Sequence, residues 1–235
     1  MGLQQVLFSI LLLLGIGFFA FNIKRLIRSI RLGRPMGSID RKKERIVAMV
    51  RLAFGQQKMQ RNLLVGVLHL VVYLGFLIIN IELIEIVIDG VFGTHRALSF
   101  LGGIYDLAIA LFELFAFAVI VSVMVFWIRR NLMHIRRFMS AELRGWSKLD
   151  ANLILIIELV LMFLFLGMNA TDYALQLRGI AHYSPAGSFP ISGWIAPIFE
   201  NWADVNVIAF ERFMWWAHIV GILGFLNYLY YSKHL

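Results

Sequence analysis

Residues 63–88 read LLVGVLHLVVYLGFLIINIELIEIVI, an apolar run that is interrupted by one histidine, one asparagine and two glutamates. A helix of about 20 mainly apolar residues crosses the hydrocarbon core of a bilayer, so this stretch predicts a membrane-spanning helix. The whole chain of 235 residues is 60% hydrophobic and only 15% charged. One soluble core of this size would not use so much apolar surface, and we therefore expect an integral membrane protein.

Four further stretches are long and apolar enough to span. Together with residues 63–88, they predict an all-α bundle of five transmembrane helices surrounded by membrane lipid. The predicted spans are 3–23, 63–88, 104–128, 153–169 and 205–230. The N-terminal stretch lacks a basic region and a small-residue cleavage site, so it reads as a retained helix rather than a signal peptide. Without an internal repeat or a low-complexity segment, we expect a single domain over 1–235.

Basic residues decide the predicted orientation. The segment between the first two spans holds two acids, Asp40 and Glu44, and twelve basic residues: Lys24, Arg25, Arg28, Arg31, Arg34, Arg41, Lys42, Lys43, Arg45, Arg51, Lys58 and Arg61. Segment 129–150 is also basic, whereas 90–103 and 171–204 are poor in Lys and Arg. The positive-inside rule then places the N-terminus outside and the C-terminus in the cytoplasm. It also accounts for the net charge of +8, so nucleic acid is not an expected partner.

The first basic segment also carries an apolar pattern of helical period. A cap at Ser38 or Asp40 would precede the apolar residues Ile46, Met49, Val50, Ala53 and Phe54. This pattern predicts an amphipathic helix that lies on the inner membrane face.

Two histidines lie inside predicted spans, His69 in the second and His218 in the fifth. Each has a glycine one turn away, Gly66 and Gly221, which we expect to leave the backbone beside the ring open. Neutral imidazole is the usual axial ligand of haem iron, and an open helix face would admit the macrocycle. Three interpretations stay open from the residues alone: bis-histidine haem b, a hydrogen bond between helices, and a proton relay.

Carboxylates in the spans form a second signal. Glu113 and Glu158 lie in apolar runs, where they predict either a proton path or hydrogen bonds between helices. We expect a water-exposed rim for residues nearer the outer ends, and solvated rings for His95, His134 and His182 in the loops. The rim residues are Asn80, Glu82, Glu85 and Asp106, and the expected outer aromatic belt is Trp194, Trp202, Trp215 and Trp216.

Three stretches carry a family resemblance: FGQQKMQRNLLVGVLHLVVYLGFLIINIE, LRGWSKLDANLILIIE and WWAHIVGILGFLNYLYYSKHL. Their order over nearly the whole chain resembles the gamma subunit of respiratory nitrate reductase. It also resembles the cytochrome b subunits of heterodisulfide reductase and dissimilatory sulfite reductase complexes. It is most similar to the membrane region that precedes a cysteine-rich domain in some bacterial iron–sulfur oxidoreductases.

The resemblance implies a cytochrome b of the bacterial cytoplasmic membrane that exchanges electrons between a quinone and a cytoplasmic partner. His69 matches the second-helix haem ligand and His218 the first ligand on the fifth helix. The second fifth-helix ligand of the family falls just beyond Leu235, two positions after His234, and its second ligand on the second helix corresponds to Ile79. One haem b is therefore expected, held by His69 with His218 in the first place and by His69 with His234 in the second.

The absence of cysteine excludes thiolate-held iron–sulfur clusters from this chain, so the implied clusters belong elsewhere. We expect either that a longer protein has been cut after SKHL, removing a C-terminal domain, or that a separate iron–sulfur or flavin protein is the partner. Such a chain would be an electron-transfer subunit or membrane domain of a quinone-linked oxidoreductase. The alternative is a scaffold or transporter subunit without haem, although no pair of broken helices marks a transporter.

Overall fold

Five long helices make up most of the chain that the structure describes. The computed structural model describes residues 2–33, 40–55, 62–133, 135 and 145–232, and none of these forms a strand. The long helices are α1 (Leu3–Arg31), α3 (Leu63–Phe92), α4 (Gly103–Asn131), α5 (Trp146–Leu177) and α7 (Asp204–Tyr228). All five are long and apolar enough to span a membrane, which confirms the predicted all-helical spans. The predicted His134 and His234 lie outside the described residues.

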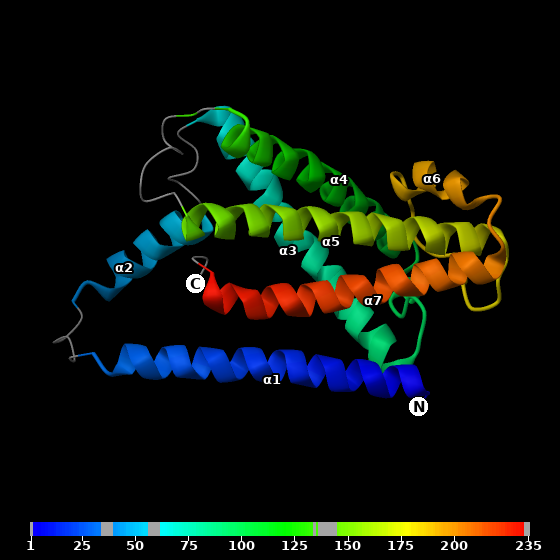
Figure 1. Cartoon of the computed structure of the whole chain (residues 1–235), viewed down its shortest axis with the longest axis horizontal. Coiled ribbons are helices and arrows are strands. Elements are labelled where there is room, and N and C mark those ends of the chain that lie inside the picture. Colours follow the sequence, from blue (N-terminus) through cyan, green and yellow to red (C-terminus); the bar gives the residue numbers. More distant parts are fainter. Residues whose placement is uncertain (1, 34–39, 56–61, 134, 136–144, 233–235) are drawn as a thin grey trace.

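The helices form a bundle in which α7 lies between α1 and α5 (Figure 1). α5 packs along α7 and α4, and α4 packs along α3, which crosses the others obliquely and also contacts α1. The N-terminus and the end of α7 lie at opposite ends of the bundle (Figure 1), as five successive crossings require.

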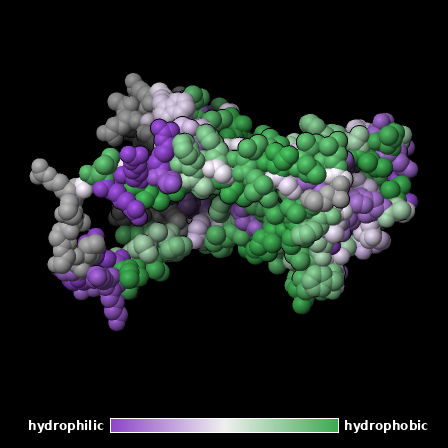
Figure 2. All heavy atoms as spheres, turned by 90° about the horizontal axis from the view of Figure 1, so that it is seen from below, coloured by the Kyte–Doolittle hydropathy of each residue, from purple (hydrophilic) through white to green (hydrophobic). Residues whose placement is uncertain are grey.

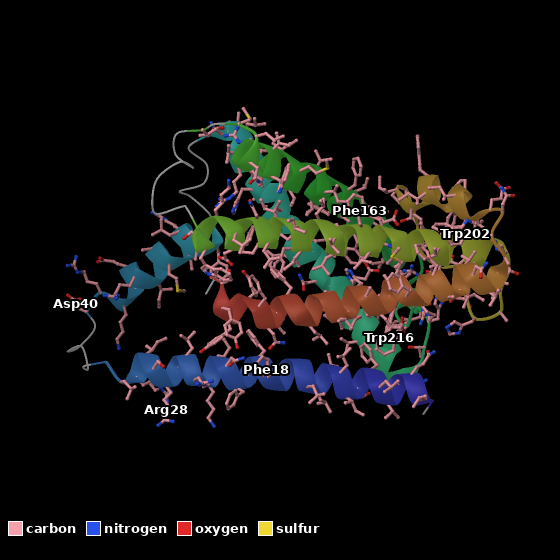
Figure 3. All side chains as sticks on the ribbon, viewed as in Figure 1. Phe18, Arg28, Asp40, Phe163, Trp202 and Trp216 are labelled. Atoms are coloured by element: carbon pink, nitrogen blue, oxygen red, sulfur yellow. The ribbon has the colours of Figure 1, made fainter. Side chains whose placement is uncertain are left out.

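The two ends of the bundle differ. We call the end that carries the basic last turn of α1, with Arg28 and Arg31, the basic end. The opposite end, which carries the connections 93–102 and 178–203, is the loop end. Figure 2 shows apolar surface along the helices and hydrophilic residues gathered toward the ends. In Figure 3, Arg28 lies at the basic end, Trp202 at the loop end, and Phe18 and Phe163 in between.

Local capping sets several helix boundaries. The Asn62 side chain accepts a hydrogen bond from the Val65 amide at 3.3 Å and begins α3. Gly93 ends it with φ of 71°, a left-handed conformation that glycine adopts without steric cost. Gly102 and Gly145, also at positive φ, directly precede α4 and α5.

The fourth span is longer than predicted, because α5 continues to Leu177 instead of ending at Asn169. The polar residues that seemed to end it, among them Asn169, Thr171 and Asp172, are buried in the bundle and hydrogen-bonded there. Hydropathy alone cannot distinguish a polar residue that ends a span from one that is satisfied by neighbouring helices.

Short helical segments lie outside the spans at both ends of the bundle. At the loop end, α6 (Ser192–Ile195) runs into the 3₁₀ turn Ala196–Phe199. At the basic end, α2 (Lys42–Met49) continues as a π-helical turn over Val50–Phe54. The N-cap residue of α2 is Arg41, at φ of 48° and without a side-chain cap hydrogen bond. The predicted cap at Asp40 is therefore wrong, and Ser38 lies outside the described residues. Ile46, Met49 and Phe54 are exposed.

Candidate functional site

His218 is the better defined of the two span histidines. It lies on α7, is 3% exposed, and its Nδ1 donates a hydrogen bond to the Leu161 carbonyl of α5 at 3.1 Å. The Phe165 ring lies beside it, with ring centres 5.9 Å apart. Because a carbonyl only accepts, Nδ1 carries the proton, and the neutral ring keeps a free lone pair on Nε2. This is the arrangement in which a second partner orients an imidazole for metal ligation.

His218 lines a cavity of about 100 Å³ between α3, α4, α5 and α7, which we call the apolar cavity. Its wall also contains Glu82, Glu158, Asn80, Val72 and apolar residues such as Phe76, Ile79, Met162, Phe165, Ile222 and Phe225. The polar residues of this wall are few among apolar ones, which is the usual composition of a cofactor or ligand pocket.

His69 lies on α3, half-buried, toward the basic end from this cavity. Its Nδ1 is buried without a hydrogen-bond partner among the described residues. His69 does not line the apolar cavity, although Val72, one turn along the same helix, does. The structure therefore places the two histidines on helices that border one cavity. Among the contacts of the described residues, none joins the His69 ring to the His218 ring.

Of the two predicted glycines, Gly221 is placed differently from the expectation. A Cβ atom on Gly221 would meet the Cδ2 atom of Leu161 at 2.8 Å, so this glycine lets α7 approach α5 closely. The space beside it is filled rather than open. Gly66 is buried near the start of α3.

The donor chemistry of these residues fits a haem, since His218 offers a neutral, oriented nitrogen and His69 a nitrogen without a partner. The apolar cavity is smaller than the several hundred Å³ of typical small-molecule sites. Holding a macrocycle between His69 and His218 would therefore require α3 and α7 to lie farther apart than they do here.

The two carboxylates that predicted a proton path lie in separate places. Glu113 is fully buried and accepts hydrogen bonds from the amides of Ile191 at 2.9 Å and Ser192 at 3.0 Å. It also accepts one from Asn169 at 3.3 Å, so it fastens the 178–203 connection to α4 and α5. Glu158 lines the apolar cavity together with His218. No contact between Glu113 and Glu158 occurs among the described residues.

The expected solvated rim is wrong for Glu82 and Glu85, which are each 4% exposed. Both oxygens of Glu85 are engaged: Oε1 accepts from the Leu98 amide at 2.8 Å and Oε2 from the Tyr105 hydroxyl at 2.9 Å. The 93–102 connection folds back over the end of α3 and meets Glu85 through the Leu98 amide. Of the three predicted rim residues on α3, only Asn80 is exposed, and its side-chain amide donates a hydrogen bond to the Phe76 carbonyl.

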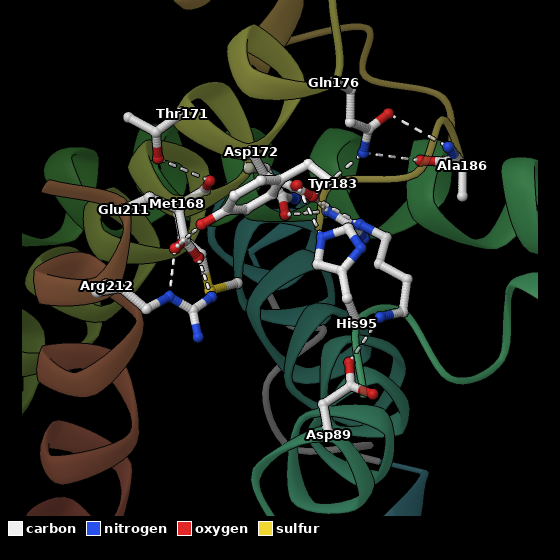
Figure 4. A network of polar contacts seen from close by, with 12 residues as sticks. Asp89, His95, Met168, Thr171, Asp172, Gln176, Tyr183, Ala186, Glu211 and Arg212 are labelled. Atoms are coloured by element: carbon white, nitrogen blue, oxygen red, sulfur yellow. Dashed lines mark hydrogen bonds and ion pairs between the residues drawn. The ribbon is translucent and has the colours of Figure 1, made fainter. Parts of the chain in front are cut away.

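A buried ion pair lies at the centre of the loop end. The Arg96 guanidinium contacts the Asp172 carboxylate at 2.6 Å and also donates to Tyr105 at 3.1 Å and Asn169 at 3.0 Å. Asp172 in turn contacts His95 Nε2 at 2.9 Å (Figure 4), so His95 is not the solvated loop ring expected from the sequence. The neighbouring carboxylate raises the pKa of Arg96 further above its usual value, against the opposing effect of burial.

These groups border a second cavity of about 230 Å³ at the loop end, which we call the polar cavity. Its wall includes Gln4, Gln5, Phe8, Glu82, Glu85, Asp89, Thr94, His95, Arg96, Asp172, His182, Glu211, Arg212, Trp215 and Trp216. Trp215 is 9% exposed and packs on Phe8, with ring centres 5.3 Å apart, so it belongs to the interior and not to the expected outer belt. Figure 3 shows Trp216 toward α1, and Trp194 and Trp202 are exposed.

The loop residues around the polar cavity are electrostatically coupled. The Tyr183 hydroxyl donates to Glu211 at 2.9 Å, and Arg212 pairs with the same carboxylate (Figure 4). Burial, and then the positive charge of nearby basic groups, lowers the pKa of His182 below its usual value. Burial likewise raises the pKa of Tyr183.

Sequence reasoning missed Arg96 and Asp172 because they are 76 residues apart and Asp172 was assigned to a loop. A signal was present, since Asn169, Asp172 and Gln176 recur at helical spacing directly after an apolar span. Read as a helix extension, that spacing would have placed three polar side chains on one buried face.

Comparison with known proteins gives one informative match. The chain is 27% identical over 231 residues to a Bacillus subtilis (strain 168) protein named "Probable iron-sulfur-binding oxidoreductase FadF". The match covers 98% of this chain and 31% of the relative, so the chain spans about a third of that protein's length. No protein-family model matches the chain. No solved structure matches it either.

Proposed function

We propose that this chain is the membrane electron-transfer unit of an oxidoreductase, and that it passes electrons between a membrane quinone and an iron–sulfur or flavin protein. The observation that carries the proposal is the similarity over nearly the whole chain to a protein named as an iron–sulfur-binding oxidoreductase. That relative is about three times as long as the match, and this chain has no cysteine. The clusters would therefore be carried by protein outside this sequence.

Haem b is the proposed cofactor, held by His69 together with His218 in the first place, and by His69 together with His234 in the second. When bound, the haem supplies one-electron chemistry within the membrane. The Leu161 carbonyl holds the His218 ring in the tautomer that leaves Nε2 free. Phe165, Leu161 and Met162 surround the ring with apolar side chains and exclude water from it. Without cysteine the haem could not be attached through thioethers.

The proposed orientation has the basic end in the cytoplasm of a bacterial cell and the loop end outside. The exposed apolar side chains of α2 and its π-helical turn would then rest on the inner membrane surface. A basic inner surface favours an acidic docking partner through electrostatic attraction. Reporter fusions after Met36 and after Gly187 should give opposite compartment signals, and equal signals would contradict the orientation.

A visible spectrum tests the cofactor. Full-length protein expressed with adequate haem should show a b-type spectrum on dithionite reduction, with about one haem per chain in a pyridine haemochrome assay. His218→Ala should abolish the signal, whereas His182→Ala, a change in an exposed loop histidine, should leave it intact. Folded wild-type protein without any haem would refute the cofactor.

A quinol analogue tests the electron-transfer role. It should reduce the haem of the isolated chain, and no soluble substrate should then be turned over. Sustained turnover of such a substrate by this chain alone would point instead to a self-contained enzyme.

A further inference from the structure

Glu82 lines both cavities. Together with Ile86 it is part of the wall of the apolar cavity, where His218 lies, and of the polar cavity, where Arg96 and His95 lie. It is 4% exposed, and its Oε2 is buried without a hydrogen-bond partner among the described residues. A buried carboxyl oxygen without a partner is costly, and in native proteins it marks either a functional group or a bound water.

The other acids of this region are already engaged. Glu85 accepts hydrogen bonds on both oxygens, and Asp172 is paired with Arg96 and His95. Asp89 accepts from the amides of Arg96 and Ala97, and Glu211 is held by Arg212 and Tyr183. Protonation of any of these would break bonds that hold the loop end together. Glu82 can change its protonation state without that loss.

Burial disfavours the charged form of Glu82 in the chain as it stands, since the side chain is 4% exposed. The nearest cation, Arg96, uses its donors on Asp172, Asn169 and Tyr105. The other titratable groups near Glu82 come from α3, α4, α5 and α7. They are Glu85 on α3, Glu113 on α4, Asp172 and Glu158 on α5, and Glu211, Arg212 and His218 on α7. An acid without its own cation in such a place is stabilised as the protonated carboxyl.

We propose that Glu82 is a proton-carrying residue that connects the polar cavity to the apolar cavity. The polar cavity, at about 230 Å³, has room for several waters and the polar partners to hold them. Among the described residues, Glu82 is the only acid that lines both cavities, and its side chain is flexible.

The use of this proton rests on the proposed function. In the haem-free chain Glu82 keeps its proton. In the oxidised, haem-loaded chain, the added positive charge beside His218 would favour the Glu82 carboxylate. An electron from quinol that cancels this charge would then favour uptake of one proton by that carboxylate. An O–H bond forms on Glu82 as one breaks in a hydronium that reaches it through the polar cavity. When the electron leaves for the partner, the proton returns by the same route. Glu82 would thus offset the charge of the electron beside His218.

Infrared spectroscopy tests the proton itself and needs no haem. The spectrum of the wild-type chain minus that of Glu82→Gln should contain a carboxyl C=O band that shifts in D₂O. Glu158→Gln is the matched control, because Glu158 lines only the apolar cavity, and it should leave the Glu82 band in place. Persistence of the band in Glu82→Gln, or its absence from the wild type, would overturn the proposal. Near-isosteric Gln keeps the fold, which thermal unfolding checks.

A redox titration of the haem-loaded chain tests the coupling. The wild-type midpoint potential should fall as pH rises, and Glu82→Gln should flatten this dependence while Glu158→Gln keeps it. Flattening by Glu158→Gln alone, or an unchanged slope in Glu82→Gln, would overturn the coupling. If the protein binds no haem, the proposed function fails, and the infrared result alone decides whether Glu82 carries a proton.

Discussion

The loop end and the basic end of this bundle are built on different principles. At the loop end, connections 93–102 and 178–203 are fastened to the helices by buried charges, chiefly Arg96 with Asp172 and Glu113 with two backbone amides. At the basic end, the last turn of α1 carries exposed arginines, and every described residue of the short helix α2 is exposed. Buried charges thus fasten the connections at the loop end, whereas the arginines that end α1 meet solvent at the basic end.

This contrast indicates that buried charges in the bundle lie where a connection between helices is held in one arrangement. A buried charge is costly unless it is paired, so pairs such as Arg96 and Asp172 tolerate few alternative arrangements. A basic terminus in water has no such constraint. The loop end is therefore suited to shape a cavity, whereas the basic end is suited to present charge to a partner.

The largest expected effect follows from breaking the central ion pair. Arg96→Met leaves Asp172 buried without its cation, and removal of one member of a buried pair costs about 3–5 kcal/mol of folding free energy. Denaturant titration in detergent should show this loss, and the double variant Arg96→Met/Asp172→Asn should recover part of it. A single variant as stable as the wild type would show that the loop end does not depend on the pair.

An equivalent test at the basic end should give a smaller effect. Asp150 is 2% exposed and accepts hydrogen bonds from the Tyr228 hydroxyl at 2.5 Å and the Ser232 hydroxyl at 3.2 Å. Asp150→Ala leaves those hydroxyls without this partner, at a cost of about 1–3 kcal/mol. The same denaturant titration measures it. A loss equal to that of Arg96→Met would remove the energetic contrast between the ends.

Substitutions at Gly90 and Gly15 test two packing contacts of α1, one with α3 at the loop end and one with α7 farther along α1. A Cβ on Gly90 would lie 2.5 Å from the Phe8 ring, whereas one on Gly15 would meet the flexible Leu223 side chain at 3.1 Å. Gly90→Ala should therefore cost about 1–3 kcal/mol, as overpacking usually does. Gly15→Ala should cost less, because Leu223 can shift. The reverse order in thermal unfolding would mean that α1 is held mainly away from the loop end.

The smallest effect concerns pH at the loop end. Because the pKa of His182 is lowered in the folded protein, the unfolded chain binds the proton more readily. Its contribution to stability is complete above the unfolded value of 6.5 and is lost as pH falls below it toward the folded pKa. His182→Gln should reduce the slope of stability against pH in that range. An unchanged slope would exclude His182 as its source.

The candidate site was only partly predictable. His69 and His218 stand out in sequence because an ionisable ring in an apolar run needs a reason, wherever the helices lie. The role of Gly221 was not predictable, since its neighbour Leu161 comes from another helix. Glu82 looked like a rim residue because it lies near the end of an apolar run. Its burial depends on side chains that other helices bring beside it.

The five spans and their all-helical form follow from the amino-acid sequence alone, because a long apolar run in a bilayer must satisfy its own backbone hydrogen bonds, which is a local requirement. The asymmetry of basic residues between loops is likewise a property of the sequence. Only the tertiary structure decided which polar residues are interior. Arg96 and Asp172 are far apart in the chain, and Glu82 joins two cavities through walls that several helices build together. Burial of a polar group is a property of its neighbours, and neighbours are set by packing.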